Sequence, residues 1–174
     1  MKKSKKFNQY KADNEAFLAD KAAEEGVLAL DNGVVIRKLE QGRGKVHPAP
    51  GSVVYVNYTG RLMDGTVFDS TDGQALPALF RVRDLIMGWQ IALVRMHEGD
   101  KFRVWIPAKY AYGSAKMDMI PAWSTLEFDI ELVKIAQPAG RCSYPPHAWN
   151  NAVEQCRGTM PCAPGVFSLT AVVF

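Results

Sequence analysis

The stretch that most constrains the fold is VYVNYTGRLMDGTVFDS, at residues 54–70. Its first half alternates as a half-buried strand does. Because successive side chains of a strand point to opposite faces, Val54, Val56 and Tyr58 share one face. The residues between them share the other face. The segment therefore predicts a strand with one buried side.

A tight turn follows this strand. Asp64 and Gly65 supply the positive φ that a hairpin turn requires, so the chain can reverse before its second strand. The hairpin brings Tyr58, Phe68 and Asp69 to one place. Two aromatic rings and a carboxylate gathered in this way predict the wall of a pocket.

The segments around this hairpin indicate an α+β fold. Residues 52–62 and 66–70 form the hairpin strands, and residues 101–107 and 125–135 alternate in the same manner. Residues 84–96 predict the single short helix of the domain. Several antiparallel strands and one helix imply a twisted sheet that wraps around the helix.

The N-terminal region predicts a helix and then a hairpin. The helix ends at Gly26, and the stripe along it contains Phe7, Tyr10, Asn14, Phe17, Leu18 and Lys21. That stripe can dock on the domain, pair with a second copy, or stay in solvent, and the pattern leaves all three open. Asp31-Asn32-Gly33 then joins two strands that we expect at an edge of the sheet.

The composition limits the partners and the location. With 174 residues, 48% of them hydrophobic, the chain can bury one full core. A net charge of +3 is too small to indicate a nucleic-acid partner. Lysines open the chain, but charged residues interrupt residues 7–21, so we expect no signal peptide and a cytoplasmic protein. No segment approaches the roughly 20 apolar residues of a membrane span.

The chain divides into three parts: a basic leader and helix at 1–26, a domain at 27–136 that includes the leading hairpin, and a tail at 137–174. Prolines interrupt the tail, which we expect to be disordered or loosely attached. Its side chains with metal-binding potential are Cys142, His147, Cys156 and Cys162. They lack a CxxC pair, so a zinc site is disfavoured, and we expect no metal and no cofactor.

Further short motifs follow the hairpin: LIMGW at residues 85–89, PAKYAYG at 107–113 and IPAWSTLEFDIEL at 120–132. In this order and at these intervals the chain resembles the FKBP-type peptidyl-prolyl cis-trans isomerases, over roughly residues 51–135. Residues 17–44 also look like the connector of the macrophage-infectivity-potentiator type, a bacterial subgroup. The resemblance implies an isomerase that rotates Xaa-Pro bonds in a dry aromatic pocket during protein folding.

The resemblance also implies roles for particular residues. Trp89 would form the floor beneath a substrate proline ring, open to solvent above it. Tyr112 would donate its hydroxyl to a substrate carbonyl, and the backbone N–H of Ile86 would hold another. Asp69 would accept a hydrogen bond from Tyr58 rather than transfer a proton.

The remaining residues implied by the resemblance surround that floor. The walls and rim comprise Tyr58, Phe68, Ala78, Phe80, Leu85, Ile86, Met119, Ile120 and Phe128. Taken one at a time, the apolar members are more often simple core residues, since large apolar side chains are usually buried for packing. The joint match favours a pocket.

Some positions depart from the family pattern. Ala78 stands where many members carry a bulky aromatic residue, so we expect a wider cavity and weakened affinity for macrolide inhibitors. The overhanging loop at 114–123 is about one residue shorter than usual. Trp123, at its end, can grip an unfolded chain or pack on the sheet edge. We interpret His47 and His97 as surface or loop residues.

The expected partners are proline-containing peptides and unfolded chains, with no nucleic acid and no membrane. A dimer is possible, but most of the region that dimerises in the related connectors is missing here, which disfavours it. One rival function is a catalytically weak chaperone or adaptor that uses the same groove to bind peptides. Another is a thiol enzyme built on Cys142 and His147, which the proline-rich context does not favour.

Overall fold

A computed structural model describes residues 2–30 and 32–136 of the chain. Its elements are α1 (Lys2–Ala22), β1 (Val27–Ala29), β2 (Val35–Glu40), β3 (Val53–Leu62), β4 (Val67–Ser70), β5 (Ala78–Arg81), the 3-10 helix η1 (Val82–Asp84), α2 (Met87–Leu93), β6 (Lys101–Ile106), the 3-10 helix η2 (Ala108–Tyr110) and β7 (Leu126–Ala136). The predicted tail and its cysteines lie outside these residues.

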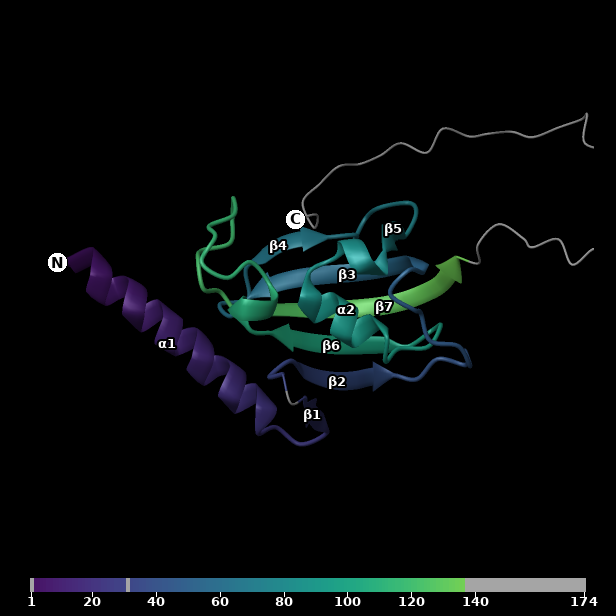
Figure 1. Cartoon of the computed structure of the whole chain (residues 1–174), viewed down its shortest axis with the longest axis horizontal. Coiled ribbons are helices and arrows are strands. Elements are labelled where there is room, and N and C mark those ends of the chain that lie inside the picture. Colours follow the sequence, from purple (N-terminus) through teal and green to yellow (C-terminus); the bar gives the residue numbers. More distant parts are fainter. Residues whose placement is uncertain (1, 31, 137–174) are drawn as a thin grey trace, which may run out of the picture.

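One seven-stranded sheet forms the body of the described chain, with strand order β1-β2-β6-β7-β3-β4 and β5 paired to β3. Every pairing in it is antiparallel. The curved sheet lies behind α2, while α1 lies beyond one end of the strands (Figure 1). The predicted α+β class is confirmed, and β1 with β2 forms the expected edge.

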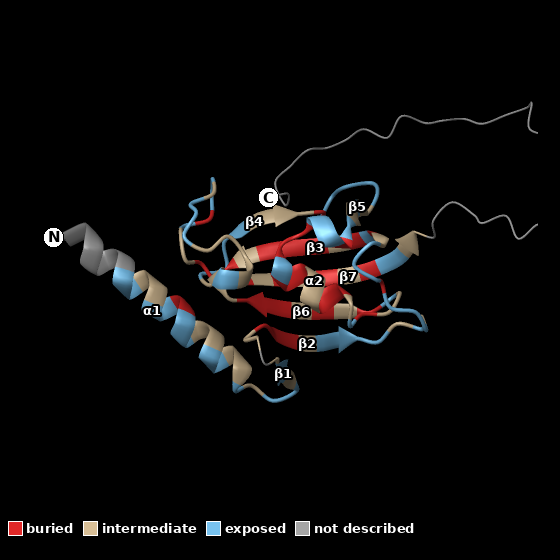
Figure 2. Ribbon diagram, viewed as in Figure 1, coloured by how far each residue is buried: buried red, intermediate tan, exposed pale blue. Residues whose placement is uncertain are grey.

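The core lies between α2 and the inner face of the sheet (Figure 2). Val54, Val56 and Tyr58 are buried there, as the alternation predicts, whereas Tyr55 is 36% exposed on the outer face. Gly88 permits the close approach of α2, because a Cβ at this position would collide with Ile106 on β6.

The predicted hairpin turn is present between β3 and β4. Gly65 has a φ of 84°, in the left-handed region that glycine enters at little cost. Its N–H donates to the carbonyl of Leu62 at 2.9 Å, and the N–H of Leu62 donates to the carbonyl of Thr66 at 2.9 Å. This turn sets the register that carries Phe68 and Asp69 toward Tyr58.

One sequence prediction is wrong in detail, and one strand was missed. The helix expected at residues 84–96 is only Met87–Leu93, because Ile86 has a non-helical backbone and Asp84 belongs to the preceding 3-10 helix. The strand β5 was not predicted. It is four residues long and pairs with β3 alone.

The N-terminal helix docks on the domain through polar contacts. The N–H of Thr125 donates to Asn14 Oδ1 at 2.7 Å, and the Thr125 hydroxyl donates to the Asn14 carbonyl at 3.2 Å. One turn earlier, the Tyr10 hydroxyl lies 2.8 Å from Ser124 Oγ. Of the three possibilities left open by the sequence, the structure therefore has the helix docked on its own domain.

The end of α1 is attached at a second place. Glu24 follows the helix and accepts from Arg37 of β2 at 2.9 Å and from Lys21 at 2.6 Å. Gly26 then reverses the chain with a φ of 74°. Within the described residues, neither α1 nor α2 combines the length and apolar character needed to cross a bilayer.

Candidate functional site

The predicted site residues come from several strands and from α2. Tyr58 lies on β3, Phe68 and Asp69 on β4, and Phe128 on β7. Trp89 lies on α2, with Ile86 as the residue that caps this helix. Segments far apart in the sequence therefore contribute to one region, on the same face of the sheet as α2.

A hydrogen bond joins Tyr58 to Asp69. The Tyr58 hydroxyl donates to Asp69 Oδ2 at 2.6 Å, which is the contact the family resemblance implies. Burial, followed by this bond and the charge of Asp69, raises the pKa of Tyr58 far above its usual value. The hydroxyl therefore stays protonated at neutral pH and holds the carboxylate in place as a donor.

Tyr112 lies close enough to sense the same carboxylate. Burial raises the pKa of Tyr112, and the negative charge of Asp69 raises it further. A protonated hydroxyl on a half-buried ring can donate to a carbonyl oxygen. The site thus contains two tyrosine hydroxyls and one carboxylate, with both tyrosines kept in the donor form.

Trp89 is at the centre of a cluster of aromatic rings. Its ring centroid lies 5.1 Å from that of Tyr58, 5.3 Å from Phe128 and 6.2 Å from Phe80. All three pairs are edge-to-face, with interplanar angles of 84° or 85°. Phe68 extends the cluster, 5.5 Å from Phe128. Such pairs each stabilise by about 0.5–1.5 kcal/mol beyond the area they bury.

The prediction that the indole of Trp89 is open to solvent is wrong. The side chain has no exposed surface, and the described cavities of about 410 Å³ lie elsewhere. Tyr58 and Phe128, which cover the indole, are themselves almost completely buried. Its Nε1 donor has no hydrogen-bond partner among the described residues. The accessible part of the site is instead formed by half-buried Phe68, Phe80 and Tyr112.

The other predicted rim residues differ in how far they are exposed to solvent. Leu85, Ile86 and Ile120 are buried, at 5–6% exposure, and belong to the core cluster. Met119 is 54% exposed, and Ala78 is half-buried on β5 next to the cluster. The tip of the 114–123 loop therefore anchors Ile120 in the core and leaves Met119 facing solvent.

The sequence analysis did not identify Gly60 as part of this site. A Cβ at this position of β3 would lie 2.7 Å from both Phe68 Cζ and Phe128 Cε1. Only glycine lets the two rings lie directly on the strand. A glycine inside a strand signals such a close approach, so the pattern of residues 54–62 contained the information.

Three residues outside the predicted site, His47, His97 and Trp123, each lie close to another side chain. The ring centroids of His47 and His97 lie 3.9 Å apart, with the rings tilted by 42° to one another. Trp123 is half-buried, and Lys11 of α1 lies 4.4 Å from its ring centroid. Among residues 2–30 and 32–136, no group of three or more His, Cys, Asp or Glu side chains is arranged to hold a metal.

Comparisons with known proteins match the part of the chain that carries these residues. The family model described as FKBP-type peptidyl-prolyl cis-trans isomerase matches residues 44–133. A protein from Trypanosoma cruzi called macrophage infectivity potentiator is 43% identical over 74% of this chain and 66% of its own length. The FKBP-type 22 kDa peptidyl-prolyl cis-trans isomerase of Escherichia coli is 40% identical over 75% of this chain and 63% of its own.

A solved structure is also similar along nearly its whole length. The crystal structure of a peptidyl-prolyl cis-trans isomerase from Pseudomonas syringae superposes with a TM-score of 0.69 at 35% identity, covering 75% of this chain and 96% of that one. The chain spans about half to two thirds of the length of the curated relatives it matches.

Proposed function

The chain belongs to the family of FKBP-type peptidyl-prolyl cis-trans isomerases, and from this premise we propose that it accelerates cis-trans isomerisation of Xaa-Pro bonds in unfolded or proline-containing chains. The observation that supports this most directly is the Tyr58–Asp69 hydrogen bond at the edge of the aromatic cluster around Trp89. Its residues are those that the family resemblance selects.

The reaction requires no covalent intermediate. Rotation about the bond interrupts amide resonance and meets a barrier of about 20 kcal/mol. An acceleration of about 10⁵-fold requires a barrier lower by about 7 kcal/mol. Removing the imide from water contributes, because the planar ground state is more polar than the twisted state and loses more solvation.

The chain's own residues provide this environment. The rings of Phe68, Phe80 and Tyr112 form a partly exposed apolar surface against which a proline ring and its preceding side chain can bind. Binding energy from those contacts can hold the substrate in a turned conformation nearer the twisted state. The Tyr112 hydroxyl and the backbone of Ile86 are our candidates for holding the flanking carbonyls.

Access to Trp89 requires a side chain to move. Of the three rings packed edge-on against the indole, Tyr58 and Phe128 are buried, whereas Phe80 is half-buried on the short strand β5. Ala78, on the same face of β5, is small and offers Phe80 less contact than a larger side chain would. We therefore assign Phe80 as the ring that moves when a proline ring reaches the indole.

An assay on Xaa-Pro tetrapeptides tests this function. Asp69→Ala and Tyr112→Phe should each lower the catalysed rate at least about tenfold, the equivalent of about 1.4 kcal/mol of barrier. Asp20→Ala on α1 and exposed Tyr55→Phe are matched controls that should keep the parent rate. A parent protein with no acceleration, or variants as fast as the parent, would refute the assignment.

A second candidate is a peptide-binding chaperone or adaptor with little turnover. Exposed apolar side chains favour it: Leu76, Met87 and Met119 are 51–77% exposed, and each lies in a segment next to predicted site residues. Peptide binding without rate enhancement, abolished when these three residues become serine, would support this candidate over the enzyme.

Four finer properties are still predictions from the sequence: macrolide affinity, oligomeric state, location in the cell and the preferred residue before proline. Macrolide affinity should be weak because Ala78 offers less contact than an aromatic ring, and a competition binding assay measures it. Sedimentation velocity distinguishes monomer from dimer. Fractionation of expressing cells tests the cytoplasmic location. The preferred residue before proline follows from tetrapeptide turnover measured across several such residues.

A further inference from the structure

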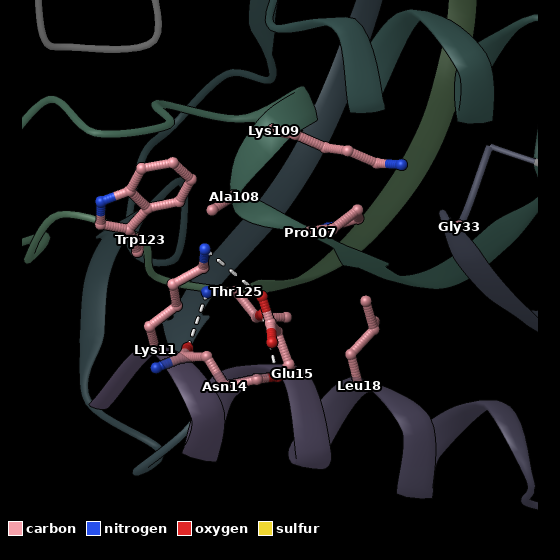
Figure 3. A pocket seen from close by; sticks show the side chains of 10 residues that line it. All are labelled: Lys11, Asn14, Glu15, Leu18, Gly33, Pro107, Ala108, Lys109, Trp123 and Thr125. Carbon is pink, nitrogen blue, oxygen red and sulfur yellow. Dashed lines mark hydrogen bonds and ion pairs between the residues drawn. The ribbon is translucent and has the colours of Figure 1, made fainter. Parts of the chain in front are cut away.

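A cavity of about 410 Å³ lies between part of α1 and the domain (Figure 3). It lies between the helix on one side and η2 with the end of the 114–123 loop on the other. Leu18 of α1 faces Pro107 and Ala108 across it, and Trp123 closes one end. The volume lies within the range of pockets that hold small molecules, about 300–1,000 Å³.

The attachment of α1 explains why this space exists. The helix is fixed to Thr125 through Asn14 and, at its end, to Arg37 of β2 through Glu24. Leu18 lies between these two attachments. A helix rises about 1.5 Å per residue, so about 12 Å of helix lies between Asn14 and its last residue, Ala22. Hydrogen bonds near both ends of this stretch hold the helix in place beside the cavity.

The charges around the cavity are not balanced. Lys11 pairs with Glu15 at 3.8 Å, and both line the cavity. Lys109 also lines it, but within the described residues it has no carboxylate within ion-pair distance. Its Nζ lies 4.0 Å from where a Cβ would stand on Gly33, and 4.9 Å from the ring of Tyr110. The cavity is otherwise mainly apolar, so the charge of Lys109 is the one there with no ion-pair partner among the described residues.

The backbone of Trp123 supports a binding role. Its φ is 65°, the one left-handed value among the described non-glycine residues. A bulky residue in that conformation is strained, and such strain concentrates at ligand sites. The N–H of Trp123 donates to the carbonyl of Gly113 at 2.8 Å, which holds the indole at the cavity wall.

We propose that this cavity binds a small apolar carboxylate, with the carboxylate against Lys109 and the apolar body between Leu18, Pro107 and Trp123. The site is separate from the aromatic cluster around Trp89 and does not depend on isomerase activity. A cation would be repelled by Lys11 and Lys109. An uncharged apolar ligand would leave Lys109 without an anion.

Calorimetric titration of the full chain with 3-phenylpropionate, and with 3-phenylpropionamide as its uncharged analogue, tests the proposal. The acid should bind at least about tenfold more tightly than the amide. Lys109→Met keeps the apolar stem but removes the charge, and should weaken acid binding until it equals amide binding. Lys45→Met, at an exposed lysine on another loop, is the matched control and should bind as the parent does.

A second measurement locates the probe. The indole N–H resonance of Trp123, assigned with Trp123→Phe, should shift during the titration, and that of Trp89 should not. Ala108→Phe, which fills the cavity, should abolish binding. The proposal is overturned if the parent does not bind the acid at millimolar concentration, if Lys109→Met binds it as tightly as the parent, or if only Trp89 responds.

Discussion

The loop at residues 114–123 joins two regions that different interactions hold together. On one side, the site around Trp89 consists of aromatic rings packed edge-to-face, with one polar pair, Tyr58 and Asp69, at its edge. On the other side, α1 is held by a few polar contacts, from Asn14 and Tyr10 and through Glu24 at its end, beside the cavity lined by Leu18 and Trp123.

This difference in the interactions predicts how each region responds to a substitution. Apolar packing in the aromatic site is shared among many contacts, and it also forms the core of the domain, so the site and the fold are stabilised together. The attachment of α1 relies on a few specific groups, so a single substitution can release the helix while the sheet stays folded. Substitutions in the two regions can therefore be compared directly.

The largest effect should follow Trp89→Ala. Removing a fully buried indole leaves a cavity in the middle of the core, and such changes cost about 3–5 kcal/mol of unfolding free energy. Trp123→Ala, at a half-buried position on the α1 side, should cost less than half as much. Urea denaturation measures both. Equal losses would show that the two regions are not distinct in this way.

A smaller effect should follow Asn14→Ala. The change removes the acceptor of the Thr125 N–H, and a buried donor left without a partner costs about 1–3 kcal/mol. Hydrogen exchange should become faster along α1 but stay unchanged in β6 and β7. Asp13→Ala, at the exposed neighbouring position, is the control. Faster exchange throughout the sheet would contradict a separately attached helix.

High pH should destabilise the aromatic site through Tyr58. Its pKa is higher in the folded protein than in the unfolded chain, where it is about 10, so the stability it contributes is complete below that pH and is lost as pH rises above it. Tyr58→Phe should reduce the slope of unfolding free energy against pH above about 10 by up to about 1.4 kcal/mol per unit.

The smallest effect should follow Lys11→Met. Lys11 lies over Trp123 and pairs with Glu15 at 3.8 Å, but the two charged side chains are 42% and 70% exposed. Exposed ion pairs stabilise by about 1 kcal/mol or less. Exchange protection of α1 should therefore change much less than in Asn14→Ala. A loss as large as that of Asn14→Ala would mean that charge, rather than the buried amide, holds the helix.

The sequence predicts the regular parts of this fold because they depend on local pattern. The alternation in residues 54–62 and the Asp64-Gly65 turn correctly place Tyr58 on the inner face and Asp69 beside it. The strand β5 could not be predicted in this way, because the four residues after Pro77 are too few to show a periodic pattern. Its Ala78 and Phe80 both face the core cluster.

Long-range contacts were not predictable in the same way. The stripe containing Tyr10 and Asn14 marks the correct face of α1, but nothing local indicates that Asn14 bonds to a residue 111 positions away. The covering of Trp89 likewise depends on how the rings of Tyr58, Phe80 and Phe128 meet in space. Sequence pattern identifies these rings as neighbours but does not set their orientation.

In the proposed function, a proline ring reaches Trp89 when Phe80 moves. The most direct test follows the indole N–H resonance of Trp89, assigned with Trp89→Phe, while an Xaa-Pro tetrapeptide is titrated and its isomerisation is measured. This resonance should shift over the peptide concentrations at which the rate saturates. An unchanged Trp89 resonance at saturating peptide, with isomerisation still accelerated, would contradict it.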